Sequence, residues 1–135
     1  MNLRHDRILL HLSKVAWDLA DTQRAKLCAA IVLKNEIISL GVNRLKTDPF
    51  QKRFGKTPYS IYLHAEISAI KNALKRLGPD DLSKATLYVA RVKSVKNSVV
   101  YGLAKPCSGC QRAIAEFGIK QVIFTNEEES TYSYL

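Results

Sequence analysis

Apolar side chains recur every three or four positions in the first part of the chain. Ile8, Leu12, Val15 and Leu19 form the clearest stripe of this kind. An α-helix has about 3.6 residues per turn, so this spacing places the stripe on one buried face. The pattern therefore predicts a first helix over about residues 3–24.

Two apolar segments follow this helix and are interpreted as strands. They cover residues 28–33 (Cys-Ala-Ala-Ile-Val-Leu) and residues 36–42 (Glu-Ile-Ile-Ser-Leu-Gly-Val). Only Lys34-Asn35 lies between them, and a two-residue polar turn is typical of an antiparallel hairpin. The segment from Asn43 to about Tyr59 then contains two prolines, a glycine and five basic residues. It is predicted to be a loop, and loops of this length in a small domain are usually functional or mobile.

The second half of the chain alternates predicted helices and strands. A second helix is expected over residues 64–77, where Gly78-Pro79 gives a stop signal. A third strand (85–92) leads into a basic segment (93–105). A third helix begins at the cysteines and ends near Gly118, which suits a helix C-terminus. A fourth strand covers residues 121–125, and the remaining residues form either a short final strand or a frayed end. This order predicts a mixed α/β sandwich with helices covering a sheet.

Composition adds limits to this picture. A chain of 135 residues that is 47% hydrophobic suits one compact domain over residues 1–135. No apolar run is long enough for a membrane span, and no signal peptide is recognisable, so we expect a cytoplasmic protein or the equivalent compartment of a host cell. The three cysteines are an odd number, and two of them form Cys107-Ser-Gly-Cys110. Metal or redox chemistry fits this pattern better than a disulfide framework.

The charge is strongly positive, at +9 from 21 Lys and Arg against 12 Asp and Glu. Such an excess attracts nucleotides, nucleic acid or phosphorylated partners, and its plain alternative is solubility. Phe50 and Phe54, within the predicted loop, are candidates for stacking on a base. A free nucleotide would use one or two of Lys46, Lys52, Arg53 and Lys56 on its phosphate. A nucleic acid would contact its backbone through these four residues together with Lys93 and Lys96.

Two short motifs carry the candidate chemistry, namely His64-Ala65-Glu66 and Pro106-Cys107-Ser108-Gly109-Cys110. A catalytic zinc site keeps three His or Cys ligands and leaves the fourth position open for water. Both motifs open predicted helices, where the positive helix end favours thiolate over thiol. The main alternative is a closed structural zinc site. Its fourth ligand would come from Cys28, His5 or His11.

The order H-x-E…P-C-x-x-C resembles the signature of zinc deaminases that act on bases. These motifs and the order of the predicted helices and strands make the chain similar to the cytidine/deoxycytidylate deaminase superfamily. The resemblance implies a cytidine-deaminase-like three-layer sandwich with a mixed sheet of four or five strands. It also implies that Zn²⁺ is the cofactor and that Glu66 moves the protons. The implied zinc ligands are His64, Cys107 and Cys110, and the implied substrate contacts are the Ala65 backbone N–H to the base and Asn43 to the sugar.

The resemblance leaves several functions open. The first is conversion of cytosine to uracil in a free (deoxy)cytidine nucleoside or nucleotide. The second is deamination of cytosine or adenine in single-stranded DNA or RNA, and the third is a silent zinc-stabilised binding module, against which the presence of Glu66 argues. Members of the superfamily often form homo-oligomers. The basic segment 93–105 lengthens the stretch between Glu66 and Pro106 relative to compact members.

Overall fold

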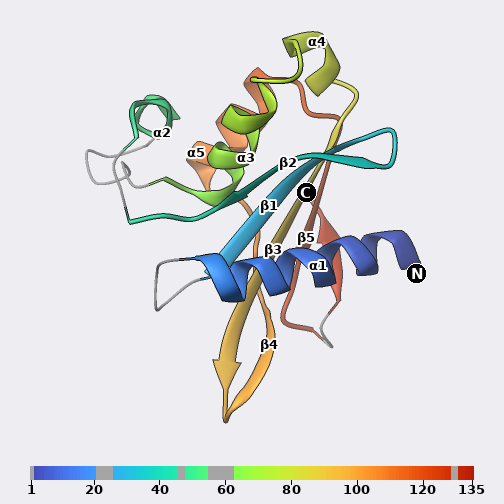
Figure 1. The fold of residues 1–135 in the computed structure, drawn as a ribbon, viewed down its shortest axis with the longest axis vertical. Coiled ribbons are helices and arrows are strands. Elements are labelled where there is room, and N and C mark those ends of the chain that lie inside the picture. Colours follow the sequence, from blue (N-terminus) through green and yellow to red (C-terminus); the bar gives the residue numbers. More distant parts are fainter. Residues whose placement is uncertain (1, 21–25, 46–47, 55–62, 129–130) are drawn as a thin grey trace.

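One mixed β-sheet with helices on both faces organises the computed structural model, which describes residues 2–20, 26–45, 48–54, 63–128 and 131–135 (Figure 1). The described helices are α1 (Leu3–Leu19), α2 (Pro49–Phe54), α3 (Ala65–Ala73), α4 (Pro79–Leu82) and α5 (Ser108–Glu116). The described strands are β1 (Lys26–Leu33), β2 (Glu36–Val42), β3 (Thr86–Val95), β4 (Ser98–Gly102), β5 (Gln121–Thr125) and β6 (Tyr132–Tyr134).

The strands run in the order β2-β1-β3-β5-β6, and β4 pairs with the far part of β3. The pairing of β3 with β5 is parallel, and the other pairs are antiparallel. Parallel neighbours need a long crossover, which α5 supplies here. Thr125 joins three strands at this junction, because its Oγ1 accepts the Arg91 N–H (3.1 Å) and donates to the Gly102 carbonyl (2.8 Å).

Both two-residue hairpin turns in the described part of the sheet are Lys-Asn pairs with positive φ angles. Lys34 and Asn35 have φ values of 51° and 67°, and Lys96 and Asn97 have 49° and 66°. These angles are typical of a type I′ turn, whose twist matches that of the flanking strands. The first turn confirms the predicted hairpin. The second folds the basic segment 93–105 into the β3–β4 hairpin, which raises the number of strands above the four or five expected.

The sheet separates two apolar clusters, as strand alternation requires. Ala29, Ile31 and Val89 belong to the cluster that packs against α3 and α5. Cys28 and Ala30 belong to the cluster that packs against α1, which crosses the strands in Figure 1. The three-layer α/β architecture is therefore confirmed.

Helix α3 rests directly on the backbone of β2 at Gly41. A Cβ atom at this position would lie 2.4 Å from the Ala69 nitrogen and 2.7 Å from the Ala65 oxygen. Both distances are shorter than a van der Waals contact, so only glycine allows this approach. The Ser39 hydroxyl also donates to the Ala69 carbonyl (2.7 Å), which fixes α3 along the strand. The first turn of α3 is thus held at a defined height above the sheet.

Three predicted boundaries need correction. Helix α1 ends at Leu19, because Ala20 is extended, and residues 21–24 of the predicted helix lie outside the described residues. Helix α3 is shorter than the predicted 64–77, and it continues into turns after Ala73. The predicted loop contains α2, which begins where Asp48 Oδ1 accepts the backbone N–H of Phe50 (2.8 Å). A short final strand forms as β6, and none of the described helices is both long and apolar enough to cross a membrane.

Candidate metal centre and active site

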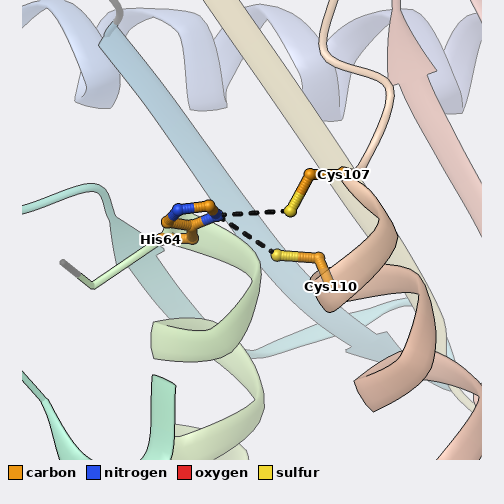
Figure 2. A group of neighbouring side chains, drawn as sticks. All are labelled: His64, Cys107 and Cys110. Atoms are coloured by element: carbon orange, nitrogen blue, oxygen red, sulfur yellow. Dashed lines mark hydrogen bonds between the residues drawn. The ribbon is translucent and has the colours of Figure 1, made fainter. Parts of the chain in front are cut away.

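His64, Cys107 and Cys110 meet at one point, although they come from two helices (Figure 2). The His64 Nδ1 atom lies 3.6 Å from the Cys107 Sγ and 3.4 Å from the Cys110 Sγ. Tetrahedral zinc, with Zn–N near 2.0 Å and Zn–S near 2.3 Å, requires N–S separations of about 3.6 Å. The donor set and its spacing therefore fit a zinc ion held by all three side chains.

Two helix N-termini create this meeting point. His64 is the N-cap of α3 and Cys107 is the N-cap of α5, and neither side chain makes a capping hydrogen bond. The imidazole and the thiol thus point away from their own helices, toward each other. The partial positive charge of a helix N-terminus favours a thiolate there. The sequence-level placement of both motifs at helix starts is confirmed.

Gln51 supports the backbone of His64 through a hydrogen bond. This contact was not predicted from the sequence. The Gln51 side chain is 1% exposed, and its Oε1 accepts the His64 backbone N–H at 3.0 Å. The contact links α2 to the start of α3 and so limits the movement of the ligand. An uncharged residue inside a basic segment gives no sequence signal for this role. Gln51 also lies on α2, in a segment that was predicted to be a loop.

Hydrogen bonds among the three ligand side chains shift the pKa of each of them. Hydrogen bonds from Cys110 and then from His64 lower the pKa of Cys107 to about 3. The hydrogen bond with Cys107, together with burial, raises the pKa of Cys110. The hydrogen bond to Cys107 also raises the pKa of His64. A divalent cation would replace the retained protons, since ligand binding to zinc releases them.

Glu66 lies in the first turn of α3, and its side chain is buried against the ligand cluster. It is 4% exposed, and burial raises the pKa of its carboxyl group. The charges of His64 and Cys107 also affect the pKa of this carboxyl group, which lies beside the ligand cluster. A carboxyl group that is shielded from water at this position is suited to accept and return protons.

The two residues predicted to touch substrate lie at the same end of the sheet. Ala65 is the first residue of α3 and is 1% exposed. Asn43 directly follows β2, and its Oδ1 accepts the Leu27 backbone N–H at 2.9 Å. The backbone N–H of Arg44, the next residue, donates to the Leu63 carbonyl (2.9 Å). Asn43 is therefore fixed next to the chain segment that leads into His64.

The three residues considered as a fourth zinc ligand do not lie with His64 and the two cysteines of α5. Cys28 is buried on the α1 side of the sheet, and burial raises its pKa to about 12. His5 is on α1, and its Nδ1 lies 2.6 Å from the Tyr88 hydroxyl. His11 is an exposed residue of the same helix. Within the described ranges, the only group of potential ligands with metal spacing contains His64 and the two cysteines of α5, which is the open arrangement typical of catalytic zinc.

Of the basic side chains expected near the substrate, those that the structure describes do not form one group. Arg53 forms an ion pair with Glu116 (2.7 Å), and Lys93 forms one with Glu127 (2.8 Å). Lys96 lies in the turn of the β3–β4 hairpin. Lys52 is exposed on α2, while Lys46 and Lys56 lie outside the described residues.

The stacking role considered for two phenylalanines is not supported by their packing. Phe54 is 6% exposed, and its ring centroid lies 5.5 Å from that of Phe50 and 6.4 Å from that of Phe117. The Phe50 ring also contacts Phe117, at 6.0 Å. The three rings close the space between α2 and α5, so the prediction that Phe54 stacks on a base is wrong.

An imidazole, two thiols and a buried carboxyl group on this fold define the site of a zinc-dependent hydrolase. The sequence matches the family model of the cytidine and deoxycytidylate deaminase zinc-binding region over residues 3–126. The chain belongs to this family of zinc-dependent hydrolytic deaminases. A search of curated proteins gave no match.

Solved structures share the fold at low sequence identity. The dCMP deaminase of cyanophage S-TIM5, in complex with dCMP and dUMP, is 22% identical, with a TM-score of 0.62 and coverage of 97% of this chain and 88% of that one. The cytidine deaminase of Burkholderia pseudomallei is 20% identical, with a TM-score of 0.63 and coverage of 96% and 90%. A tRNA:A34 deaminase is 20% identical, with a TM-score of 0.53 and coverage of 96% and 80%.

Proposed function

We propose that this chain, acting as a single deaminase domain, converts cytosine to uracil in a free (deoxy)cytidine nucleotide or nucleoside. His64, Cys107 and Cys110 hold the zinc ion, and Glu66 transfers the protons. The observation that carries the proposal is the three-ligand cluster with a buried carboxyl group beside it. The cyanophage enzyme with dCMP and dUMP supports a nucleotide as the substrate, because it has the same fold.

The reaction adds one water molecule to the C4 carbon of cytosine and releases ammonia. When bound, zinc supplies Lewis acidity that lowers the pKa of a water molecule. Glu66 accepts a proton from the attacking water and passes protons to the ring nitrogen and to the leaving amine. Burial of Glu66 on α3 shields this proton from bulk water.

Two further residues orient the substrate in this proposal. The backbone N–H of Ala65 lies in the first turn of α3, where N–H groups have no partner within the helix. It donates a hydrogen bond to the base. Asn43, which Leu27 and the adjacent Arg44 hold in place, contacts the sugar. Both assignments come from the family resemblance, and the position of the two residues near the start of α3 supports them.

Deamination of a base in single-stranded nucleic acid is the second candidate. The charge of +9 and the fold shared with a tRNA:A34 deaminase favour it. Two of the expected backbone contacts, Arg53 and Lys93, are instead paired with carboxylates, which favours the free nucleotide. A silent binding module would have no use for a buried glutamate at the ligand cluster.

Ammonia release from cytidine, dCMP and a short single-stranded oligonucleotide tests the reaction. Binding of the same three ligands to a Glu66→Gln protein across a salt series then separates the two candidates. A free nucleotide should bind with a weak dependence on salt. An oligonucleotide that neutralises several phosphates would lose log affinity at about 0.7 per phosphate for each unit of log salt. Tight, steeply salt-dependent oligonucleotide binding, with no turnover of dCMP, would overturn the proposal.

A further inference from the structure

Arg91 faces the same side of the sheet as the metal centre. It lies on β3, where it pairs with Leu27 of β1 and Gly102 of β4. Side chains alternate along a strand, so Arg91 shares its face with Leu87 and Val89. Both of these residues belong to the cluster that packs against α3 and α5. The guanidinium group therefore lies on the α3 and α5 side of the sheet.

The register also places Arg91 level with the start of α3. Gly41, Ala29 and Val89 form a row across three strands, and Ala65 lies directly over Gly41. The next row on this face contains Leu27 and Arg91, and Asn43 joins it through a backbone hydrogen bond to Leu27 (3.4 Å). The following residue, Arg44, bonds to Leu63, directly before His64. Arg91 thus occupies the row at the His64 end of α3.

Among the described residues, the Nε–H group of Arg91 has no hydrogen-bond acceptor. A Cβ atom on Gly102 would lie 2.9 Å from the Arg91 Cδ and 3.2 Å from its Nε, so the side chain lies flat over this glycine. One terminal nitrogen lies 3.5 Å from the Leu103 carbonyl oxygen, which is a long contact. The Nε atom is buried, and no described residue accepts its hydrogen. Buried donors almost always have partners, so this one indicates a ligand that supplies an acceptor.

The local charge favours an anion as that ligand. Lys93 lies two residues further along the same face and is paired with Glu127 at 2.8 Å. The Glu127 carboxylate is therefore already engaged by Lys93. The hydrogen bond from Lys93 and, more weakly, the charge of Arg91 lower the pKa of Glu127, so the carboxylate stays ionised. Among the described residues, Arg91 forms no ion pair with a carboxylate.

We propose that Arg91 binds the phosphate of the nucleotide substrate and makes the site prefer a nucleotide over the matching nucleoside. The proposal rests on the function proposed above. The Nε–H and a terminal N–H of a guanidinium group form a fork that matches two oxygens of a phosphate. Phosphate would therefore give the buried Nε–H its acceptor, while the long contact to Leu103 is released. Asn43, in the same row, would lie on the sugar side of the phosphate.

Binding of dCMP and cytidine to Glu66→Gln, with and without a second change at Arg91, tests this role. Arg91→Ala and the milder Arg91→Lys should weaken dCMP binding by about 10- to 100-fold, the range for a hydrogen bond to a charged group. Cytidine binding should stay unchanged. Inorganic phosphate should compete with dCMP on the parent protein and lose most of this effect on Arg91→Ala. In the active protein, Arg91→Lys should raise KM for dCMP with little change in kcat.

Arg76→Ala is the matched control, because Arg76 also donates to a backbone carbonyl, that of Ile38 (2.8 Å), but follows the far end of α3. It should leave binding of both ligands unchanged. Zinc content and thermal unfolding of Arg91→Lys show whether the fold is intact. Equal losses for dCMP and cytidine, or no loss for either, would refute the role of Arg91 and leave the proposed function standing. A parent protein that neither binds nor deaminates cytosine compounds would refute both.

Discussion

The Nδ1 atom of His64 lies 3.4 Å from the Sγ atom of Cys110, although 46 residues separate the two in the chain. One residue stands at the start of α3 and the other in the first turn of α5. Zinc at this point therefore joins the two helices that cover one face of the sheet. Binding of the metal and packing of these helices should stabilise each other.

Cys110→Ala should lose zinc and lower the stability of the fold. A ligand present at about 100 times its Kd stabilises the native state by about 2.7 kcal/mol, and the variant forfeits this contribution. Metal analysis and thermal unfolding, each with and without a chelator, measure the two effects. Cys28→Ala is the control, because Cys28 is buried on the other face. A Cys110→Ala protein with one zinc per chain would contradict the ligand assignment.

Glu66→Gln should separate catalysis from metal binding. The amide keeps the shape of the side chain but cannot accept a proton, so turnover should fall by about 10²- to 10⁴-fold. Zinc content should stay near that of the parent protein. Glu116→Gln serves as the control, since Glu116 is an exposed residue of α5 that pairs with Arg53. Deaminase activity close to normal in Glu66→Gln would show that another group moves the protons.

Gly41→Ala should destabilise the protein and weaken zinc binding together. The new Cβ atom would lie 2.4 Å from the Ala69 nitrogen, so α3 must move away from β2. Overpacking of this kind typically costs about 1–3 kcal/mol, and the movement carries His64 with it. Gly78→Ala offers a matched control, because a Cβ atom there meets nothing within 4 Å. Chemical unfolding and zinc competition measure both effects, and equal behaviour of the two variants would disprove the steric argument.

His5 should make the stability depend on pH. Burial, and then the charge of Arg4, lower the pKa of His5 below its ordinary value of 6.5, and Asp6 opposes them only in part. The folded state therefore binds a proton less readily than the unfolded state, so stability is full above about pH 6.5 and decreases as the pH falls toward the folded pKa. Unfolding by urea at a series of pH values measures this slope. It should be shallower in His5→Gln, which lacks this titrating group.

The metal centre could be predicted from the sequence because its signals are local. His64 and Glu66 are two residues apart, Cys107 and Cys110 are three apart, and each pair opens a helix. Helix starts have recognisable neighbours, such as Pro106 before the cysteines. The first hairpin was also predictable, since Lys34-Asn35 joins two apolar segments. Periodicity and short spacing predicted the hairpin and the helix starts, and the ligand set was implied by the resemblance of the motifs to the signature of zinc deaminases.

Contacts between distant segments could not be predicted in the same way. Gln51 supports His64 only because α2 packs beneath α3, and a six-residue helix has too little periodicity to be recognised. Its start did carry a signal, because Asp48-Pro49 is a typical helix opening. The β3–β4 hairpin was missed although Lys96-Asn97 repeats the earlier turn pair. The position of Arg91 depends on strand register, which no single segment specifies.

Cys28 is a buried thiol whose reactivity depends on the fold and not on the metal centre. It is fully buried in the α1-facing cluster, and its pKa of about 12 keeps it protonated. A thiol reagent can reach it only when the sheet opens, whereas Cys107 is exposed and Cys110 is buried beside it. The fast reaction of Cys107 should therefore measure the fraction of metal-free sites. The much slower reaction of Cys28 should report opening of the sheet, so one labelling time course measures metal occupancy and fold integrity separately.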